Sequence, residues 1–207
     1  MRFSFILLAG GESSRFKSKL PKPYQKIGRK TLIELSLNKI QRLKEFKKII
    51  VVCNKRHKKF LAKIKLDKVT IINGGITRQQ STFKALNYLH KKKIINKVLI
   101  HDSARPNFSL NLIKKILIKS KKNSTVIPVL KLQDAIKEKY NNYKFKNLKQ
   151  NNFFLTQTPQ CFQFKEIYDV HKKNKDEYND DDLSLMNFNS KIKFLDGEKP
   201  NFKITDK

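Results

Sequence analysis

The chain has 207 residues, 39% of them hydrophobic, and a formal net charge of +30 from 47 Lys and Arg against 17 Asp and Glu. This length accommodates one α/β domain with a sizeable core, and no apolar run reaches the roughly 18 residues of a membrane-spanning helix. The apolar run Phe3–Leu8 is too short for a signal peptide and lacks a following cleavage site of small residues, so we expect a cytoplasmic protein. The two cysteines, Cys53 and Cys161, form no metal-binding or disulfide pattern, and Cys53 is expected in the core.

The positive charge makes a nucleic-acid-binding protein one alternative, because such a surplus attracts polyanions. Only seven of the 47 basic residues are Arg, and the lysines are spread along the whole chain rather than gathered in one stripe with aromatic residues between them. Charge alone therefore predicts a weak, salt-sensitive affinity for nucleic acid and not a specific function.

Short apolar runs alternate with amphipathic stretches over the first 130 residues. This alternation predicts an α/β fold in which a mostly parallel sheet is flanked by helices, with ligands beyond the carboxyl ends of the strands. The expected strands are Phe3–Leu8, Ile49–Cys53, Val69–Ile72, Val98–Ile100 and Thr125–Leu130, and the expected helices are Thr31–Leu43, Gln80–His90 and Leu110–Lys121.

The pattern changes after residue 132. Asp134–Tyr140 and Tyr143–Leu148 are expected as two short strands about a turn at Asn141-Asn142, because Asn tolerates positive φ. They would form an arm, at about 133–150, that projects from a single domain covering 1–207. The last expected elements are a helix at Phe164–Lys175 and short strands at Ile192–Leu195 and Phe202–Ile204.

The stretch Phe3–Tyr24 has the features of a phosphate-binding loop. Gly10 and Gly11 follow the first expected strand, where they let the backbone approach a ligand and expose its N–H groups. Arg15 and Lys22 add positive charge to the same loop. The alternative is an ordinary turn between strand and helix with scattered surface cations.

Four further segments contain residues suited to a nucleotide site. Asp102, at the end of an expected central strand, is suited to hold Mg²⁺, and Arg105 is suited to bind a phosphate. The acidic cluster Asn179–Asp182 either caps a helix or helps to organise the site. The four segments are Asn73-Gly-Gly-Ile-Thr-Arg-Gln-Gln-Ser81, His101-Asp-Ser-Ala-Arg-Pro106, Thr156-Gln-Thr-Pro-Gln160 and Asn201-Phe-Lys-Ile-Thr205.

Together with L-A-G-G-E-S-S-R-F and P-K-P-Y of the opening loop, these segments resemble the 2-C-methyl-D-erythritol 4-phosphate cytidylyltransferase family over nearly the whole chain. The pair H-D-S-A-R-P and T-P-Q is specific to this family and its close relatives. The resemblance implies a Rossmann-like nucleotidyltransferase fold and transfer of CMP from CTP to methylerythritol phosphate in the non-mevalonate isoprenoid pathway. The implied products are 4-diphosphocytidyl-2-C-methyl-D-erythritol and pyrophosphate. It also implies Mg²⁺ or another divalent cation and a homodimer formed through the arm.

The resemblance assigns a role to each candidate site residue. Because the nucleophile is already an anionic phosphate, the implied chemistry needs cations and no catalytic His or Cys. The implied catalytic residues are Arg15, Lys22 and Lys203, and Asp102 is the implied metal ligand. The implied CTP-binding residues are Ala9, Gly10, Gly11, Ser13, Arg15, Lys22, Gly75, Arg78, Ser81, Asp102 and Ser103. The implied acceptor-binding residues are Asp102, Arg105, Gln150, Thr158 and Asn179.

The chain departs from the family pattern at five positions. Ser13 stands where the family usually has Gly, and Ile76 where an acidic residue is common; Ala135, Gln150 and Asn179 replace Thr, Arg and Thr. Most of these changes concern the acceptor, so ribitol-5-phosphate cytidylyltransferase is the main alternative, and a non-catalytic nucleotide-binding relative is another. Family members run on past the last segment, so we expect Lys207 to end a fragment, in some relatives followed by a fused 2-C-methyl-D-erythritol 2,4-cyclodiphosphate synthase domain.

Overall fold

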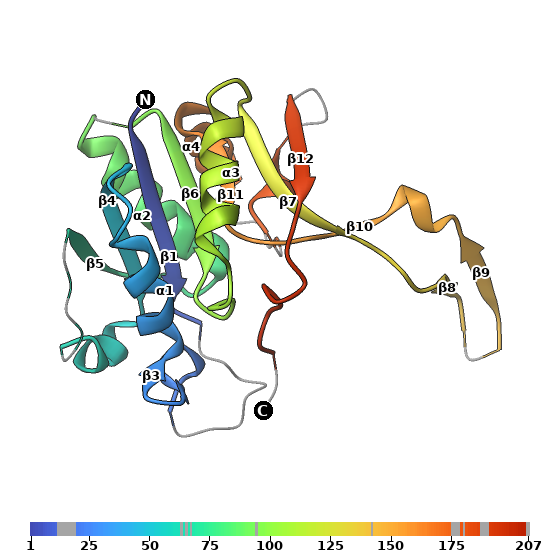
Figure 1. Cartoon of the computed structure of the whole chain (residues 1–207), viewed down its shortest axis with the longest axis horizontal. Coiled ribbons are helices and arrows are strands. Elements are labelled where there is room, and N and C mark those ends of the chain that lie inside the picture. The colour runs from blue at the N-terminus through green and yellow to red at the C-terminus, as the bar shows by residue number, and fades with distance from the viewer. Residues whose placement is uncertain are drawn as a thin grey trace.

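A central sheet of eight strands forms the body of the molecule (Figure 1). The structure is a computed structural model, and it describes residues 1–11, 20–62, 64, 66, 68–93, 95–141, 143–174, 179, 181–186 and 191–205. The strand order is β10-β7-β11-β6-β1-β4-β5, and β12 pairs with β7. These strands are β1 (Phe3–Ala9), β4 (Phe46–Cys53), β5 (Val69–Asn73), β6 (Lys97–Asp102), β7 (Thr125–Lys131), β10 (Phe154–Thr156), β11 (Gln160–Gln163) and β12 (Ile192–Asp196).

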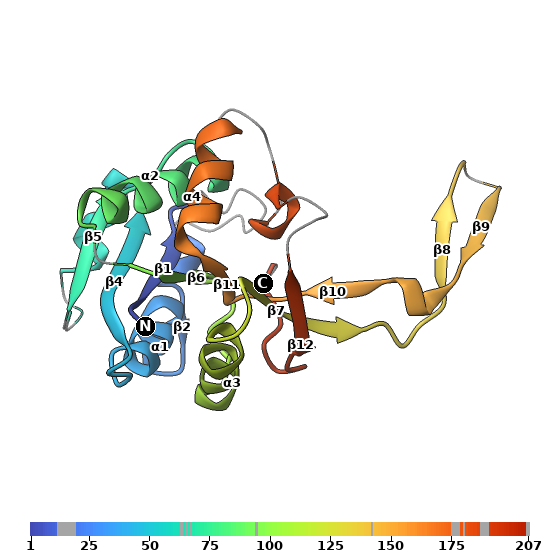
Figure 2. The ribbon, with the colours of Figure 1, turned by 90° about the horizontal axis from the view of Figure 1, so that it is seen from above.

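Strand β1 is buried along its whole length between two layers of helices, which Figure 2 shows on opposite faces of the sheet. Phe5 and Leu7 belong to the core that includes α1 and α3, whereas Ile6 and Leu8 belong to the core that includes α2 and α4. Successive side chains of a strand point to opposite faces, so an uninterrupted apolar run is what a doubly covered strand requires. The helices are α1 (Leu32–Ile40), α2 (Arg78–Lys91), α3 (Leu110–Ser120) and α4 (Phe164–Lys173).

The expected helices are confirmed, with ends that shift by a few residues. The Thr31 hydroxyl caps α1 and pairs with Glu34 in a capping box, and Thr77 caps α2 by accepting from the Gln80 N–H. The cap at Thr77 starts α2 directly after the second glycine pair. No helix in the described part of the chain is long and apolar enough to cross a membrane.

Two strands of the sheet were not predicted, and one predicted strand is wrong. β11 runs antiparallel to both β6 and β7, and β10 runs antiparallel to β7. Both are short, and β11 begins and ends with Gln, so neither has a clear alternation of apolar and polar residues. The expected strand Phe202–Ile204 is irregular instead, because its backbone pairs with no strand of the described structure and the Ile204 N–H donates to the Ala104 carbonyl in a loop. Lys203 therefore does not lie in a strand.

The arm predicted for about 133–150 is confirmed as a separate two-stranded sheet that projects far from the body (Figure 1). The Asn141 side chain accepts the N–H groups of Tyr143 and Lys144 at the tip, whereas Asn142 lies outside the described residues. The arm consists of β8 (Ile136–Lys139) and β9 (Phe145–Leu148). The remaining short elements are β2 (Lys26–Ile27), β3 (Lys30–Thr31) and the 3₁₀ helices η2 (Lys22–Tyr24), η3 (Lys55–Phe60), η4 (Gln150–Asn152) and η5 (Leu183–Leu185).

Candidate active site

The carboxyl ends of β1 and β6 and the start of α2 surround a cavity of about 330 Å³. Ser13 and Arg15 lie outside the described residues, so their predicted roles stay predictions. Lys203 and Asn179 also line this cavity, although Asn179 was expected on the acceptor side. The predicted CTP-binding residues that the structure describes all line the cavity: Ala9, Gly10, Gly11, Lys22, Gly75, Arg78, Ser81, Asp102 and Ser103.

A second cavity, of about 760 Å³, lies on the other side of Asp102 and Lys203, and both residues line the two cavities. Arg105 and Thr158, predicted to bind the acceptor, line the second cavity. Its wall combines these polar groups with apolar side chains from η5 and β12, so it offers both charged and apolar contacts. Gln150 lines neither of these two cavities; it lies in η4 at the base of the arm, where its side chain donates to the Leu132 carbonyl.

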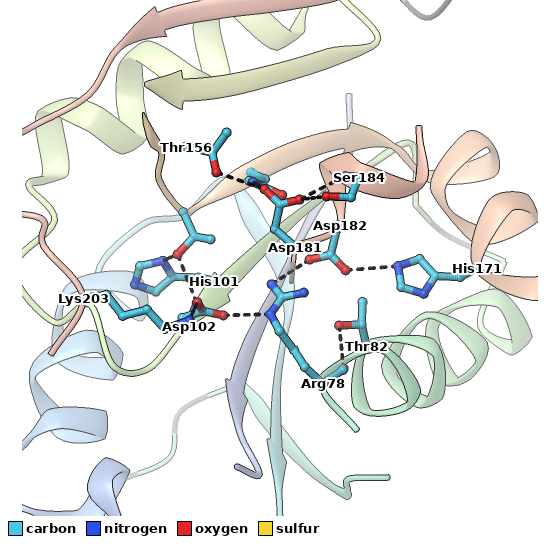
Figure 3. Close-up of polar contacts among 12 residues, drawn as sticks. Arg78, Thr82, His101, Asp102, Thr156, His171, Asp181, Asp182, Ser184 and Lys203 are labelled. Atoms are coloured by element: carbon cyan, nitrogen blue, oxygen red, sulfur yellow. Dashed lines mark hydrogen bonds and ion pairs between the residues drawn. The ribbon is translucent and has the colours of Figure 1, made fainter. Parts of the chain in front are cut away.

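Asp102 is bound by two cations where the cavities meet (Figure 3). Arg78 Nε lies 3.2 Å from Asp102 Oδ1, and Lys203 Nζ lies 3.1 Å from Oδ2. Burial alone would raise the pKa of Asp102, but the charges of Arg78 and Lys203 outweigh it and hold that pKa below its ordinary value. Asp102 is therefore an anion that fixes two cations at the boundary between the cavities.

A chain of polar contacts continues from Arg78 into the protein (Figure 3). Arg78 Nη2 lies 2.8 Å from Asp182 Oδ2, and Asp182 Oδ1 lies 3.0 Å from His171 Nε2. The side chains of Asp182 and His171 are almost fully buried, and Arg78 and His171 lower the pKa of Asp182 although burial alone would raise it. The Asp182 carboxylate thus holds Arg78 in place for Asp102.

Both alternatives for the acidic cluster therefore apply. Asp182 organises the site through Arg78, and Asp181 accepts the backbone N–H of Ser184 at 3.0 Å at the start of η5. Asp181 also accepts from Thr156 at 3.0 Å and from Gln160 at 2.8 Å in the wall of the second cavity. No local pattern singles out His171, which lies among the lysines of an ordinary amphipathic helix. The pairing depends on the packing of α4 against α2.

A buried His–Thr pair fixes the backbone that presents Asp102. The His101 Nε2 atom lies 3.0 Å from the Arg105 carbonyl oxygen, so Nε2 carries the proton. Nδ1 then accepts from the Thr158 hydroxyl at 2.9 Å, and the Thr158 oxygen accepts the Asp102 N–H at 3.2 Å. Burial lowers the pKa of His101 to about 3, so the imidazole stays neutral and acts as a support rather than a charge.

A sequence model of the 2-C-methyl-D-erythritol 4-phosphate cytidylyltransferase family matches residues 3–207. The chain belongs to this family. Membership confirms the predicted family and fold, and it favours a nucleotidyltransferase over the nucleic-acid-binding alternative.

Relatives of two lengths are similar to the chain. The bifunctional enzyme IspD/IspF of Pelagibacter ubique (strain HTCC1062) is 42% identical over 99% of this chain, which spans 55% of that protein. The 2-C-methyl-D-erythritol 4-phosphate cytidylyltransferase of Thermosipho africanus (strain TCF52B) is 32% identical, with 97% of this chain and 91% of that protein covered. The chain thus spans about half of one relative and most of the other.

Solved structures agree with this assignment. The structure of the bifunctional IspDF from Campylobacter jejuni has a TM-score of 0.84 at 27% identity, covering 100% of this chain and 52% of that one. The 4-diphosphocytidyl-2C-methyl-D-erythritol synthase of Anaerococcus prevotii DSM 20548 has a TM-score of 0.82 at 30% identity, covering 99% and 90%. The mostly parallel sheet flanked by helices is the fold of these neighbours.

The described positions that depart from the pattern of the cytidylyltransferase family lie in different places. The Ile76 side chain is 96% exposed at the rim of the first cavity, and its backbone N–H donates to Gln80 Oε1 at 3.0 Å. Ala135 and Gln150 lie at the base of the arm, outside both cavities of their own chain. Their predicted contribution concerned the partner subunit and stays a prediction.

Neighbouring atoms leave no room for a side chain at the second glycine pair, Gly74 and Gly75. A Cβ atom on Gly75 would lie 2.4 Å from Gln80 Cβ, whereas a Cβ on Gly11 would meet nothing within 4 Å. We expect Gly75→Ala to lower the free energy of unfolding by about 1–3 kcal/mol, because overpacking displaces the start of α2. Urea unfolding with Gly11→Ala as the matched variant measures this difference; equal stabilities would contradict the steric argument.

Asp102 is the residue best placed to hold a metal ion. The described residues contain no group of three or more His, Cys, Asp or Glu side chains that could bind one. Mg²⁺ is typically bound by one or two carboxylates together with substrate phosphates and water. A single carboxylate on a cavity wall, such as Asp102, fits that mode of binding, with most ligands supplied by the nucleotide.

Proposed function

We propose that the chain transfers CMP from CTP to 2-C-methyl-D-erythritol 4-phosphate, in a reaction that depends on Mg²⁺ or another divalent cation. The observation that carries this proposal is the pair of adjacent cavities with Asp102 and Lys203 in both walls. A reaction between two phosphate-bearing substrates needs cations where the substrates meet. Membership in the cytidylyltransferase family and the names of its relatives support this acceptor over ribitol 5-phosphate.

In the proposed reaction an oxygen of the acceptor phosphate attacks the α-phosphorus of CTP. The bond from the α-phosphorus to the bridging oxygen of the β-phosphate breaks, and pyrophosphate leaves with that electron pair. The described cations Lys22 and Lys203 lower the repulsion between the two anions, and Arg78 keeps Asp102 oriented. Glycine backbone at residues 10, 11 and 75 leaves room for the nucleotide against the ends of the strands.

Asp102 would hold the divalent cation together with phosphate oxygens of CTP. A bound cation supplies positive charge that neutralises the phosphates during transfer. Asp102 keeps its negative charge at neutral pH because its pKa is lowered by Arg78 and Lys203. The carboxylate is thus in the form that a hard cation prefers.

The proposal includes a homodimer that forms through the arm, in the cytoplasm. Exposed aromatic side chains on the arm and beside it support this contact, among them Tyr143 (93% exposed), Phe145 (61%) and Phe154 (41%). In a second copy the arm would bring Gln150 to the acceptor side of its partner's site. A fused cyclodiphosphate synthase domain is a further proposed partner, supported by the bifunctional name of the Pelagibacter ubique relative.

Pyrophosphate release from CTP and Mg²⁺ with a panel of polyol phosphates tests the proposal. We expect release with 2-C-methyl-D-erythritol 4-phosphate and little with ribitol 5-phosphate. Release with ribitol 5-phosphate alone would contradict the acceptor and retain the reaction class. If the folded chain released none with any acceptor while still binding CTP, it would be a non-catalytic nucleotide-binding protein.

Lys22→Ala is expected to lower kcat/KM by about 10²-fold, because one fixed cation near the phosphates is lost. Lys22 lines the first cavity, and its Nζ lies 2.6 Å from the Thr205 carbonyl oxygen. The exposed residue Lys165 on α4 offers a matched variant, Lys165→Ala, which should keep the activity of the unaltered chain. Steady-state assays of both variants that gave the same kcat/KM would show that the triphosphate lies elsewhere.

A further inference from the structure

The segment that contains Lys203 is irregular, so other groups must hold it. Residues 197–205 form no helix or strand. Backbone hydrogen bonds tie this segment to the sheet region at Gly197, which donates to the Val129 carbonyl, and at Ile204, which donates to the Ala104 carbonyl. Lys203 lies between these points, with its side chain 41% exposed. The position of its ammonium group therefore depends on side chains that bind the segment.

Gln157 contributes four hydrogen bonds to that connection, beside two that Ser109 donates to the Glu198 carboxylate. Gln157 Nε2 donates to the carbonyl oxygens of Glu198 at 2.8 Å and Asn201 at 3.2 Å. Its Oε1 accepts the Glu198 N–H at 3.0 Å and Asn201 Nδ2 at 3.4 Å. Gln157 is only 2% exposed, and two donor and two acceptor contacts use the full capacity of its amide.

We call the Gln157 side chain with its bonds to Glu198 and Asn201 the clamp. The clamp is anchored on the sheet and is closely packed. The Gln157 backbone N–H donates to the Pro128 carbonyl of β7 at 2.8 Å. A Cβ atom on Gly197 would lie 2.5 Å from Gln157 Oε1, so the amide lies directly against the backbone of the segment. Asn201 completes the attachment, since its Nδ2 donates to the Thr158 carbonyl at 2.8 Å and its own carbonyl accepts from Arg105.

We propose that Gln157 is a positioning residue that acts through Lys203. It lines neither of the two cavities that meet at Asp102, so it does not bind substrate in them; it holds the segment from which Lys203 reaches Asp102. The inference rests on the proposed function, in which Lys203 stabilises charge on the phosphates. Displacement of a catalytic group by about 1 Å can cost about 10²-fold in rate, so the loss of the clamp should be expressed in kcat.

A double-mutant cycle with Gln157→Met and Lys203→Ala tests this coupling in the full chain. We expect Gln157→Met to lower kcat by about 10- to 100-fold and to have no further effect when Lys203 is already Ala. An unchanged kcat, or effects that multiply in the double variant, would overturn the proposal. Amide hydrogen exchange should accelerate at residues 198–204 and not in β1; unchanged exchange there would also overturn it.

Two further variants separate positioning from stability. Asn201→Asp keeps the shape of the side chain but removes the two hydrogen bonds that Asn201 Nδ2 donates, to Gln157 Oε1 and to the Thr158 carbonyl. It should therefore lower kcat as Gln157→Met does, even where Gln157→Met folds poorly. Lys97→Met removes comparable hydrogen bonds, to the Asn123 and Ser124 carbonyls, at the amino end of β6, the end away from Asp102. It should leave kcat and the exchange of residues 198–204 unchanged, and a loss of kcat equal to that of Gln157→Met would overturn the proposal.

The two proposals fail in different ways. A chain without turnover on any acceptor contradicts the proposed function. In that case, measurements of CTP affinity test whether Gln157 positions Lys203. If Gln157→Met weakens CTP binding as much as Lys203→Ala and loosens residues 198–204, the positioning role stands. If Lys203→Ala weakens CTP binding and Gln157→Met does not, the positioning role is wrong.

Discussion

Asp102→Asn is expected to lower kcat by about 10³-fold, because an uncharged amide then replaces the carboxylate that binds Arg78 and Lys203 where the two cavities meet. Arg78 and Lys203 lose the charge that holds them 3.2 and 3.1 Å from the carboxylate oxygens. The same change removes the carboxylate proposed to bind the divalent cation. Pyrophosphate release at saturating CTP and acceptor measures the effect on kcat.

Binding of CTP gives a second measure of the same substitution that does not depend on turnover. Mg²⁺ should tighten CTP binding to the unaltered chain and should have a much smaller effect on the Asp102→Asn variant. Asp169→Asn is the matched control, since Asp169 is an exposed carboxylate on α4 that pairs with Lys165 away from the cavities. A kcat for Asp102→Asn within threefold of that of Asp169→Asn would contradict the central role of Asp102.

Asp182→Asn is expected to lower the free energy of unfolding by about 3 kcal/mol, the largest loss of stability that we expect from one substitution. The amide keeps the volume of the carboxylate but removes the negative charge that binds Arg78 Nη2 at 2.8 Å and accepts from His171 Nε2 at 3.0 Å. Urea unfolding at neutral pH measures this loss. Asp169→Asn should change stability by less than about 1 kcal/mol, because exposed ion pairs contribute little.

The difference between these variants should depend on pH in a defined direction. The pKa of Asp182 is lowered in the folded chain, so the contacts of its carboxylate with Arg78 and His171 stabilise the fold above the unfolded pKa of about 3.9. That contribution is lost as the pH falls through the lower pKa of the folded chain. The stability gap between the unaltered chain and Asp182→Asn should therefore narrow below about pH 4, and a gap that widened there would contradict the assignment.

The limits of prediction from sequence are clearest at β11 and at residues 201–205. β11 has four residues, and its pairing with β6 and β7 becomes favourable only when both neighbours are in place. Residues 202–204 include Phe202 and the β-branched Ile204 but find no partner strand in the described structure. The Ile204 N–H donates instead to the Ala104 carbonyl, and Gln157 binds the preceding backbone at Glu198 and Asn201. In both places tertiary contacts overrode local preference.

Most of the buried strands, the helices and the polar residues at the carboxyl ends of the strands were predictable from the amino-acid sequence. Apolar periodicity and helix caps are local, and parallel strands bring their carboxyl ends to one edge, so Gly10, Gly75 and Asp102 were predictable neighbours. Two features follow from tertiary packing alone: the Arg78 guanidinium contacts both Asp102 and Asp182, and Gln157 holds the segment that contains Lys203. These partners are 24 to 104 residues apart, and the choice among many possible ion pairs depends on distances and burial that no local pattern contains.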